Sequence, residues 1–305
     1  MNESLSDVAV VILNYNTVLD TINLVSHILK FNSGIFVIVV DNNSTDSSWA
    51  DLVHEFSNIK HVKLFRNYSN GGYAKGNNIG IGLAKSINGI KFVAIVNPDV
   101  IFEKKTLEEM RNVLSDEKIG LVTARTIYCG EERKYNECAW KHANLWRWIF
   151  DVTIFGTLLR RGNFNNIMEK IRGYYPPAYY ADTLVFVDVV QGCFFLTKLQ
   201  TMLDVRGFDE GTFLYYEEDI LAKKIEKTNK RNAVLSKYWI KHNHKTKNKE
   251  LKDKNKKIFH VKQEYSSRKY YLDKYCKLNK LLKLLIKSIW MFDYAMKCIS
   301  VRLLC

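Results

Sequence analysis

The chain has 305 residues, of which 47% are hydrophobic and 13% aromatic, with three prolines and no biased repeat. This composition can form a buried core and excludes disordered, collagen-like and solenoid proteins. The formal net charge is +14, from 46 Lys and Arg against 32 Asp and Glu, and the length indicates one large domain or two modest ones.

The positive charge is concentrated in the C-terminal part of the chain. Residues 221–305 contain 24 Lys and Arg against 6 Asp and Glu, a net charge of +18, whereas residues 1–220 carry −4. A cationic segment beside a nearly neutral body favours an anionic partner, which is a phospholipid surface, a nucleic acid or a phosphorylated substrate.

The cysteines and the N-terminus indicate a reducing compartment. The six cysteines are scattered, with no CxxC pair and no Cys/His cluster at zinc spacing. The sequence therefore predicts neither a disulfide framework nor a structural zinc. Residues 1–7 are polar and are followed by an apolar run of about eight residues, which fits no secretory signal. We expect a cytoplasmic protein.

The first hundred residues have the pattern of a parallel sheet. Apolar runs predict strands at residues 8–13, 35–40, 59–65 and 91–96. A helix is expected over 18–31, and residues 44–46 can cap a second one. Strand–helix–strand units with polar residues after each strand are typical of a parallel sheet with a ligand crevice. Residues 1–100 are thus predicted to form a nucleotide-binding half.

The next part of the chain adds more strands, a helix and an aromatic insertion. Strands are expected at residues 119–125, 185–197 and 233–241, with a helix over 217–230. Residues 140–180 contain ten aromatic side chains, which is typical of either a core flap or an adhesive surface.

The C-terminal part is a lysine-rich loop at 242–257 and an apolar segment at 281–305. Lys283, Lys287 and Lys297 interrupt the apolar segment, so no charge-free stretch of about eighteen residues is left for a membrane-spanning helix. Two alternatives stay open: a basic amphipathic helix in a membrane interface, and a helix packed on the body of the protein.

Short polar side chains follow three of the predicted strands, at residues 14–16, 41–46 and 97–99. Each segment alone would be an ordinary turn, but the carboxyl ends of parallel strands meet at one edge of a sheet. A glycine-rich segment at 70–80 opens a helix, and such a segment lets backbone N–H groups approach a phosphate or sugar. It matches neither the P-loop nor the dinucleotide fingerprint, which argues against NTPases and NAD enzymes.

Four ordered motifs resemble the family-2 glycosyltransferases of GT-A fold. They are VVILNYN at residues 10–16, VVDNNSTD at 39–46, NGGYAKGNNIG at 70–80 and NPD at 97–99. The likeness continues through GCFFL at 192–196, GFDE at 207–210 and FLYYEED at 213–219, and so covers most of residues 8–245. The Asn-Pro-Asp variant is most similar to the rhamnosyltransferase-type branch, which builds bacterial surface polysaccharides.

The resemblance implies a fold and a domain organisation. We expect an α/β fold with a Rossmann-like mixed, mainly parallel sheet flanked by helices. Residues 1–245 would form the catalytic domain, with its acceptor half at 101–245. Residues 246–305 lie beyond the resemblance and are expected to form a basic helical extension, for which attachment to a membrane surface is one of the two alternatives given above.

The resemblance also implies a nucleotide-sugar site. Asp41 would read a pyrimidine base, Tyr15 and Asn16 would line the base pocket, and Asn77 would lie near the nucleotide-sugar. The other expected members of this site are Asn14, Asn42, Asn43, Arg66, Gly72, Tyr73, Asn97 and Asp99.

Residues 97–99 stand at the position of the family's DxD motif, which holds a divalent cation on the diphosphate. Because Asn97 replaces the first Asp, only Asp99 offers a carboxylate, and Mg²⁺ or Mn²⁺ would need oxygen ligands from the substrate. His242 or His244 matches the family's late metal-ligand histidine. The alternative is a pair of solvated histidines in a lysine-rich loop.

Three carboxylates open the helix predicted over 217–230. Acidic residues in a first turn stabilise the helix dipole, so capping is one interpretation. The resemblance places Glu218 at the catalytic-base position, where the family usually has Asp. Asp219 is the alternative base. Glu217 is expected to cap the helix or to lie behind the base as a supporting residue. Crowded like charges raise the pKa of one such group towards the working range.

These features predict an inverting glycosyltransferase. It would move a sugar, L-rhamnose from dTDP-rhamnose in the first instance, to a saccharide or lipid-linked acceptor in O-antigen or capsule synthesis. The protein would lie peripherally on the inner face of the cytoplasmic membrane. The alternatives are a UDP-sugar donor of galactose, glucose or N-acetylhexosamine type, and a sugar nucleotidyltransferase. A nucleic-acid binder is not favoured, because lysines with scattered aromatics serve membranes and solvated faces equally well.

Overall fold

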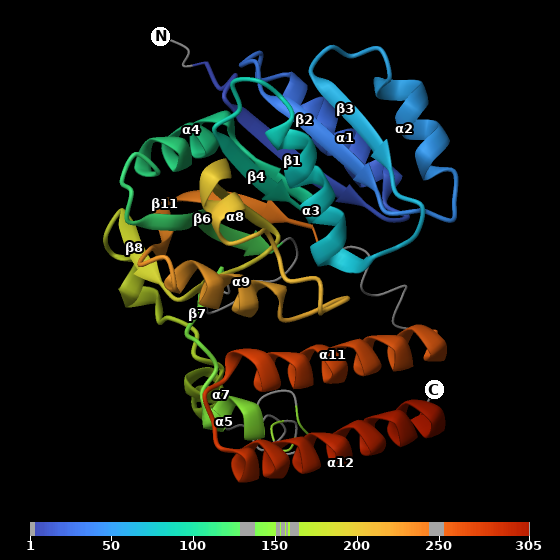
Figure 1. The fold of residues 1–305 in the computed structure, drawn as a ribbon, viewed down its shortest axis with the longest axis vertical. Helices are drawn as coiled ribbons and strands as arrows, with labels where there is room; N and C mark the ends of the chain where they lie inside the picture. The colour runs from blue at the N-terminus through green and yellow to red at the C-terminus, as the bar shows by residue number, and fades with distance from the viewer. Residues whose placement is uncertain are drawn as a thin grey trace.

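The protein is described from a computed structural model, which covers residues 4–128, 138–150, 153, 156, 158, 165–243 and 253–304. Its centre is a nine-stranded mixed sheet with the order β3-β2-β1-β4-β10-β6-β11-β5, and β8 pairs with β11 (Figure 1). The first four strands of this order are parallel, and β10 is antiparallel to both of its neighbours. The parallel part therefore brings the C-terminal ends of β1, β2 and β4 to one edge.

The strands and helices follow one another closely along the chain. The strands are β1 (Val8–Asn14), β2 (Phe36–Asp41), β3 (Val62–Arg66), β4 (Phe92–Val96), β5 (Val100–Phe102), β6 (Ile119–Tyr128), β7 (Ala139–Trp140), β8 (Leu184–Val187), β9 (Val189–Val190), β10 (Phe194–Lys198) and β11 (Arg231–His242). The helices are α1 (Val18–Leu29), α2 (Ser48–Phe56), α3 (Gly72–Lys85), α4 (Lys104–Val113), α5 (Leu145–Phe150), α7 (Asn165–Arg172), η1 (Pro177–Tyr180), α8 (Leu199–Asp204), α9 (Glu217–Glu226), α11 (Lys254–Tyr275) and α12 (Lys280–Leu304).

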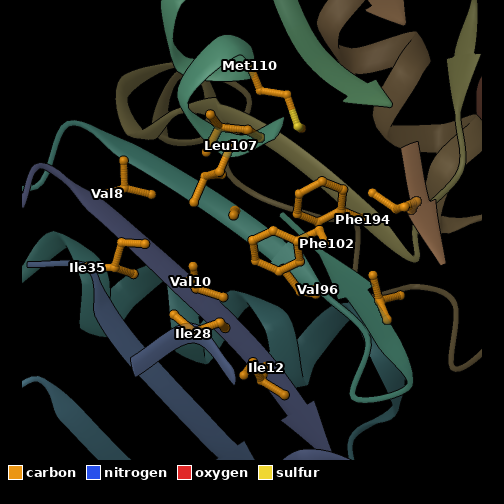
Figure 2. Packing of buried hydrophobic residues seen from close by; sticks show 14 of the residues in the cluster. Val8, Val10, Ile12, Ile28, Ile35, Val96, Phe102, Leu107, Met110 and Phe194 are labelled. Atoms are coloured by element: carbon orange, nitrogen blue, oxygen red, sulfur yellow. The ribbon is translucent and has the colours of Figure 1, made fainter. Parts of the chain in front are cut away.

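Alternating residues of the buried strands fill two separate cores. Val8, Val10 and Ile12 of β1 point to the side covered by α1 and α4, where Ile28, Leu107 and Met110 meet them (Figure 2). Ala9 and Val11 point to the opposite side, which α3, α8 and α9 cover. Burial on both sides explains why β1 and β2 read as continuous apolar runs.

Two glycines let α3 lie directly on β1. A Cβ atom at Gly76 would come within 2.3 Å of the Leu13 side chain, and one at Gly80 within 2.2 Å of Val11. The glycine-rich segment expected to cradle a phosphate thus also serves close helix–strand packing.

Most expected elements are present, and one was predicted wrongly. The single strand expected over 185–197 is three strands, because the chain turns aside at Asp188. The Asp188 carboxylate accepts the backbone N–H of His142 at 3.0 Å, and its own N–H donates to the hydroxyl of Tyr175 at 3.0 Å. The lysine-rich loop is also shorter than expected, since α11 begins at Lys254, where the Asp253 side chain caps it.

Helix α11 is bound to the loop that leads into α9. The Asp209 carboxylate accepts hydrogen bonds from the hydroxyls of Tyr270 and Tyr275 and from Lys274 Nζ. Partial burial opposes ionisation, yet these donors hold the pKa of Asp209 well below its usual range. Ser267 adds a hydrogen bond of 2.7 Å to the carbonyl oxygen of Leu214.

Helix α12 lies side by side with α11 on the far side from the sheet (Figure 1). Its Trp290 is buried and donates to the carbonyl oxygen of Trp148 at 2.6 Å. One side of α12 is packed and the other is exposed. The structure therefore agrees with both alternatives for this segment, a helix packed on the body and an amphipathic helix in a membrane interface. Among the helices that the structure describes, none is long and apolar enough to cross a membrane.

Candidate active site

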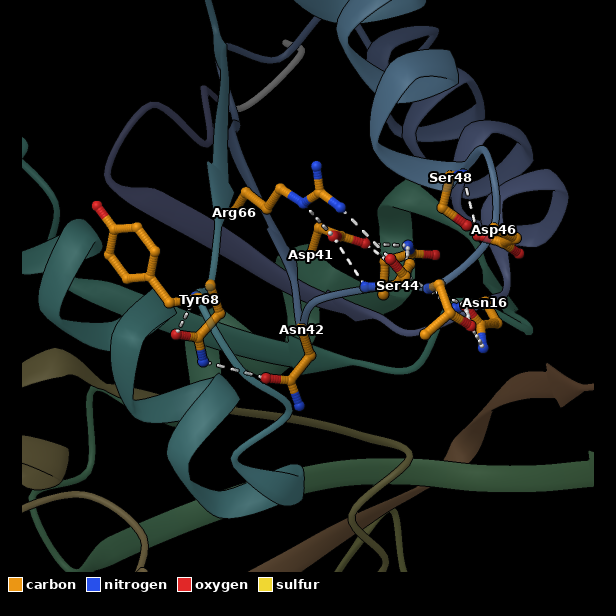
Figure 3. A network of polar contacts seen from close by, with 11 residues as sticks. Asn16, Asp41, Asn42, Ser44, Asp46, Ser48, Arg66 and Tyr68 are labelled. Carbon is orange, nitrogen blue, oxygen red and sulfur yellow. Dashed lines mark hydrogen bonds and ion pairs between the residues drawn. The ribbon is translucent and has the colours of Figure 1, made fainter.

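A buried polar network joins the C-terminal ends of β1 and β2 (Figure 3). Asn14 and Asp41 are fully buried and face each other in the strand register. Asn14 Nδ2 donates to Asp41 Oδ1 at 2.8 Å and to Ser44 Oγ at 3.1 Å, while its Oδ1 accepts the hydroxyl of Thr21 at 2.9 Å. The backbone N–H of Ser44 also donates to Asp41, at 3.1 Å. Asn14 and Asp41 thus fix the start of the loop at residues 41–46.

Arg66 covers this network from β3. Its Nε lies 3.6 Å from Asp41 Oδ2, and an Nη donates to the carbonyl oxygen of Ser44 at 3.4 Å. Tyr15 and Asn16 form the exposed rim, and Asn16 is held by Thr45, whose backbone N–H donates to its Oδ1 at 2.9 Å. Protein donors therefore occupy the Asp41 carboxylate, whereas Tyr15, Asn16 and Arg66 are open to a ligand.

Asn42 ties the same loop to the start of α3. Its Nδ2 donates to Asn70 Oδ1 at 2.9 Å and to the carbonyl oxygen of Gly72 at 3.2 Å. Asn43, next in the chain, has a φ of +63°. Gly72 has a φ of +83°, and a Cβ there would lie 2.2 Å from the carbonyl oxygen of Phe213, so only glycine fits.

Tyr73 and Asn77 carry the network towards the centre of the molecule. The Tyr73 backbone N–H donates to the carbonyl oxygen of Phe213 at 3.0 Å, and its hydroxyl donates to that of Gly192 at 2.7 Å. Asn77 is buried, and its Oδ1 has no hydrogen-bond partner in the part of the chain that the structure describes. A buried acceptor without a partner is uncommon in folded proteins.

Asp99 and His242 meet beyond the ends of β4 and β11. Asp99 Oδ1 lies 3.2 Å from His242 Nε2, and the backbone N–H of Asn243 donates to the carbonyl oxygen of Asp99 at 2.9 Å. The backbone N–H of Asn97 donates to the carbonyl oxygen of Cys193 at 2.8 Å. A carboxylate and a buried imidazole suit a divalent cation that takes its other ligands from a substrate. His244 lies outside the described residues.

The described residues contain no group of three or more His, Cys, Asp or Glu side chains placed to hold a metal.

Helix α9 carries the three predicted carboxylates in its first turn. Tyr215 and Tyr216, just before it, have φ values of +76° and +69°, and such backbone strain in non-glycine residues is concentrated at functional sites. Burial raises the pKa of Glu218 to about 7, helped by the charge of Asp219 and opposed by the N–H of Gly192. Burial, with the charge of Glu218, raises the pKa of Glu217 to about 8.

Cys193 connects the two carboxylates of the site. Burial raises the pKa of its thiol well above the usual value, with the charges of Asp99 and Glu218 as the next causes. The backbone at residues 192–193 joins the two segments, since the Gly192 N–H donates to Glu218 Oε1 at 3.2 Å and the Cys193 carbonyl oxygen accepts the N–H of Asn97 at 2.8 Å. Tyr73 shares only Glu218 with this set, since burial and then the charges of Glu218 and Glu217 raise the pKa of its hydroxyl.

Asp219 points to another part of the molecule. Trp140 Nε1 donates to both of its carboxylate oxygens at 3.3 Å, and Arg147 Nη1 lies 3.6 Å from Oδ1. Of the two candidate bases, Glu218 thus lies with Gly192 and Tyr73, and Asp219 is enclosed by the aromatic insertion.

The structure brings the expected residues together in three groups and separates Asp219 from them. The groups are the base-pocket network, the Asp99–His242 pair and the Tyr73–Glu218 pair linked through Gly192. From the sequence, Ser44 was expected only as part of a helix cap at residues 44–46, Trp140 only as part of the aromatic insertion, and Arg147 had no assigned role. Ser44 stands inside a quoted motif, but nothing in the sequence connects Trp140 to a carboxylate 79 residues later.

The glycosyl transferase family 2 model matches residues 8–175, which is more than half of the chain. The chain belongs to this family. Glycosyltransferase GlyG from Streptococcus pneumoniae is 24% identical over 180 residues, which cover 52% of this chain and 58% of GlyG. The hexosyltransferase Agl10 of low-salt glycan biosynthesis in Haloferax volcanii is 26% identical over 123 residues, or 40% of this chain and 38% of Agl10. The chain thus spans about half the length of the curated relatives it matches.

Solved structures extend the likeness to nearly the whole fold of this family-2 chain. A mannosyltransferase from Pyrobaculum calidifontis, solved with GDP-Man and Mn²⁺, has a TM-score of 0.56 at 15% identity and covers 97% of this chain and 73% of its own. GalNAc-T7, solved with UDP, GalNAc and Mn²⁺, has a TM-score of 0.58 at 14% identity, with 96% and 57% covered. The predicted GT-A fold class is confirmed, and at these identities the likeness concerns the fold alone.

Proposed function

We propose that this chain is an inverting glycosyltransferase that moves a sugar from a nucleotide-sugar to an acceptor hydroxyl. The observation that carries the proposal is the backbone at residues 192–193, where the Gly192 N–H donates to Glu218 and the Cys193 carbonyl oxygen accepts the N–H of Asn97, two residues before Asp99 of the Asp99–His242 pair. A carboxylate with a pKa near 7 can accept a proton next to a site suited to a diphosphate.

In the proposed reaction the acceptor oxygen forms a bond to the anomeric carbon. The bond from that carbon to the diphosphate oxygen breaks with its electron pair, and the hydroxyl proton passes to Glu218. Asp99 and His242 would hold a divalent cation, Mg²⁺ or Mn²⁺, which supplies positive charge to the leaving diphosphate. Two of the structural neighbours were solved with Mn²⁺, which supports a cation of this kind. Asp219 would position α9 through Trp140 and Arg147.

The nucleotide would occupy the edge at β1, β2 and α3. Tyr15, Asn16 and Arg66 would line the base pocket. Asp41 would hold the neighbouring loop at residues 41–46 and reach the base only if Arg66 moves. Asn42 and Asn43 would shape the wall, and Gly72, Tyr73 and Asn77 would lie at the sugar and phosphates.

For the donor we propose dTDP-rhamnose first, on the likeness of the Asn97-Pro98-Asp99 motif to the rhamnosyltransferase-type branch. A UDP-sugar is the alternative. Structural neighbours support that class too, since TarS of Staphylococcus aureus was solved with UDP-GlcNAc, at a TM-score of 0.54. A sugar nucleotidyltransferase is the second candidate. It would form pyrophosphate from a nucleoside triphosphate and a sugar phosphate, whereas a glycosyltransferase would not.

For the acceptor we propose a saccharide or lipid-linked oligosaccharide at the inner face of the cytoplasmic membrane, in O-antigen or capsule synthesis. The relation to a hexosyltransferase of glycan biosynthesis supports a glycan acceptor. We propose residues 1–245 as the catalytic unit and residues 246–305 as its attachment to the anionic membrane surface, with no role for nucleic acid.

A thermal-shift screen tests the nucleotide site. Ligand binding to the native state raises the melting temperature by mass action, so dTDP-, UDP- and GDP-sugars are compared with and without Mg²⁺ or Mn²⁺. We expect the largest shift for a pyrimidine nucleotide-sugar with a cation, and loss of that shift in Tyr15→Ala. Equal absence of a shift with every donor would contradict the proposal.

A further inference from the structure

We propose that the outer face of α12 is a docking surface for an anionic lipid membrane. We define this outer face by Leu281, Leu284, Leu285, Phe292, Met296 and Ile299. The inference rests on the proposed function, which places the acceptor on a lipid.

The outer face is a mainly apolar stripe, in which Ser288 and, at the C-terminal end, Arg302 are exposed polar residues. At about 100° per residue, its six side chains fall within about 120° of the helix circumference. Leu281, Leu284 and Phe292 have exposed fractions of 77%, 63% and 57%. On the opposite side of the same helix, Ile286 and Trp290 are each 1% exposed. One side of α12 thus belongs to the core with α11, and the other presents large apolar groups to solvent.

The charge around this stripe favours an anionic partner. Residues 254–304 carry thirteen Lys and Arg against three Asp and Glu, a net charge of +10. Lys277 and Lys280 are exposed at the start of the helix, and Lys287 lies beside Asp273 of α11. Two copies of this chain joined through α12 would bring two such positive surfaces together. An anionic bilayer instead accepts the apolar stripe and attracts the lysines.

The position of α12 also suits a lipid-linked substrate. Helix α11 lies between α12 and the loop that leads into α9, and it binds that loop through Asp209 and Leu214. Packed helices are 8–10 Å apart, so a membrane against the outer face would lie roughly 20 Å from the start of α9. A saccharide on a lipid diphosphate spans such a distance, and docking would bring Glu218 to its acceptor.

Vesicle co-sedimentation of the full chain tests the docking surface, without any donor present. The probes are vesicles of phosphatidylcholine alone and of phosphatidylcholine with phosphatidylglycerol. The main variant combines Leu284→Glu with Phe292→Glu, whose native side chains are exposed. Its matched control combines Leu19→Glu on α1 with Ile59→Glu, which exchange exposed apolar residues far from α12 in the chain.

A second variant tests the charge. Lys277→Gln with Lys280→Gln removes two exposed lysines near the start of α12, and Lys60→Gln with Lys85→Gln is the control. Each lysine near an anionic surface contributes roughly fivefold to partitioning at low salt.

We expect the unmodified chain to bind anionic vesicles at least roughly tenfold more strongly than neutral ones. The Leu284/Phe292 variant should lose about tenfold or more in partitioning, and both controls should keep it. Equal binding of that variant and the unmodified chain would overturn the proposal. The proposal would also be overturned if light scattering showed a dimer of the unmodified chain that is absent in the Leu284/Phe292 variant, since the stripe would then join two copies.

The thermal-shift screen on the same samples separates this proposal from the proposed function. Vesicle binding without any donor shift would leave the docking surface standing and remove the glycosyltransferase assignment. Donor-induced shifts in melting temperature without vesicle binding would remove the docking surface and leave the glycosyltransferase assignment standing.

Discussion

The backbone N–H of Gly192 donates to Oε1 of Glu218, with 3.2 Å between nitrogen and oxygen. A Cβ atom at position 192 would lie 2.6 Å from the same oxygen, which is too close for any real contact. The hydrogen bond and the absent side chain together fix where the proposed base sits.

Gly192→Ala should therefore displace Glu218 and slow transfer without preventing donor binding. A misplacement of about 1 Å in a reacting group costs up to roughly a hundredfold in rate. The matched control is Gly82→Ala, because a Cβ there meets nothing within 4 Å. Steady-state kinetics would show a lower kcat with an unchanged donor KM in the first variant alone. A normal kcat for Gly192→Ala would mean that Glu218 tolerates displacement and is not the base.

Glu217 should make the folded protein less stable as the pH rises. Burial raises its pKa to about 8 in the folded state, against an ordinary value near 4.5. The folded chain then binds more protons than the unfolded chain between about pH 4.5 and pH 8, so the free energy of unfolding falls across that window. Glu217→Gln should raise the melting temperature at pH 8 and flatten its dependence on pH.

The exposed Glu55 on α2 supplies the control for this experiment, as Glu55→Gln. Each pKa unit corresponds to about 1.4 kcal/mol, so we expect an effect of up to a few kcal/mol at pH 8 for Glu217 alone. Parallel pH profiles for Glu217→Gln and the unmodified chain would contradict the assignment of a buried, protonated carboxyl.

Arg147 should act as a positioning residue for α9. Its guanidinium lies 3.6 Å from Asp219, and removing it leaves a buried carboxylate with Trp140 as its remaining partner among the contacts described above. We expect Arg147→Ala to lower kcat roughly ten- to a hundredfold with donor KM unchanged. Arg147→Lys should restore part of kcat, because it keeps the charge. A purely structural role would instead lower stability and leave the kcat of the folded fraction normal.

The metal assignment predicts a specific loss of cation binding. Replacing His242 with Ala removes one of the two protein ligands, and Asp99→Asn removes the charge of the other. Calorimetric titration of Mn²⁺ into the chain with a nucleoside diphosphate should show weaker binding in both variants. His260, which accepts or donates a hydrogen bond of 2.9 Å with Tyr215, gives the control variant His260→Ala. Unchanged Mn²⁺ affinity in His242→Ala would remove His242 from the site.

The sequence predicted the sheet well because its signals are local. Apolar runs such as Val8–Leu13 and the polar residues that follow them depend only on neighbours in the chain, so the edge holding Asn14 and Asp41 could be found directly. The break at Asp188 could not, because it depends on hydrogen bonds to His142 and Tyr175.

The site was predictable where a motif carries it and not where distant segments meet. The resemblance named Asp99 and His242 or His244 as metal ligands, but Asp99 and His242 are 143 positions apart and only the pairing of β11 with β5 and β6 shows how they meet. The resemblance placed Glu218 at the base position with Asp219 as the alternative, and the contacts with Gly192 and Trp140 show that the two side chains leave α9 in different directions. The attachment of α11 to Asp209 likewise involves residues from separate parts of the chain.

The most direct test of Glu218 as the catalytic base compares Glu218→Gln with the unmodified chain in donor binding and in transfer. Glu226→Gln, at the other end of α9, is the control. We predict that Glu218→Gln keeps the donor-induced shift in melting temperature and loses roughly 10²- to 10⁴-fold in transfer rate, as expected for removal of a general base. Transfer by Glu218→Gln at the rate of the unmodified chain would show that Glu218 is not the base.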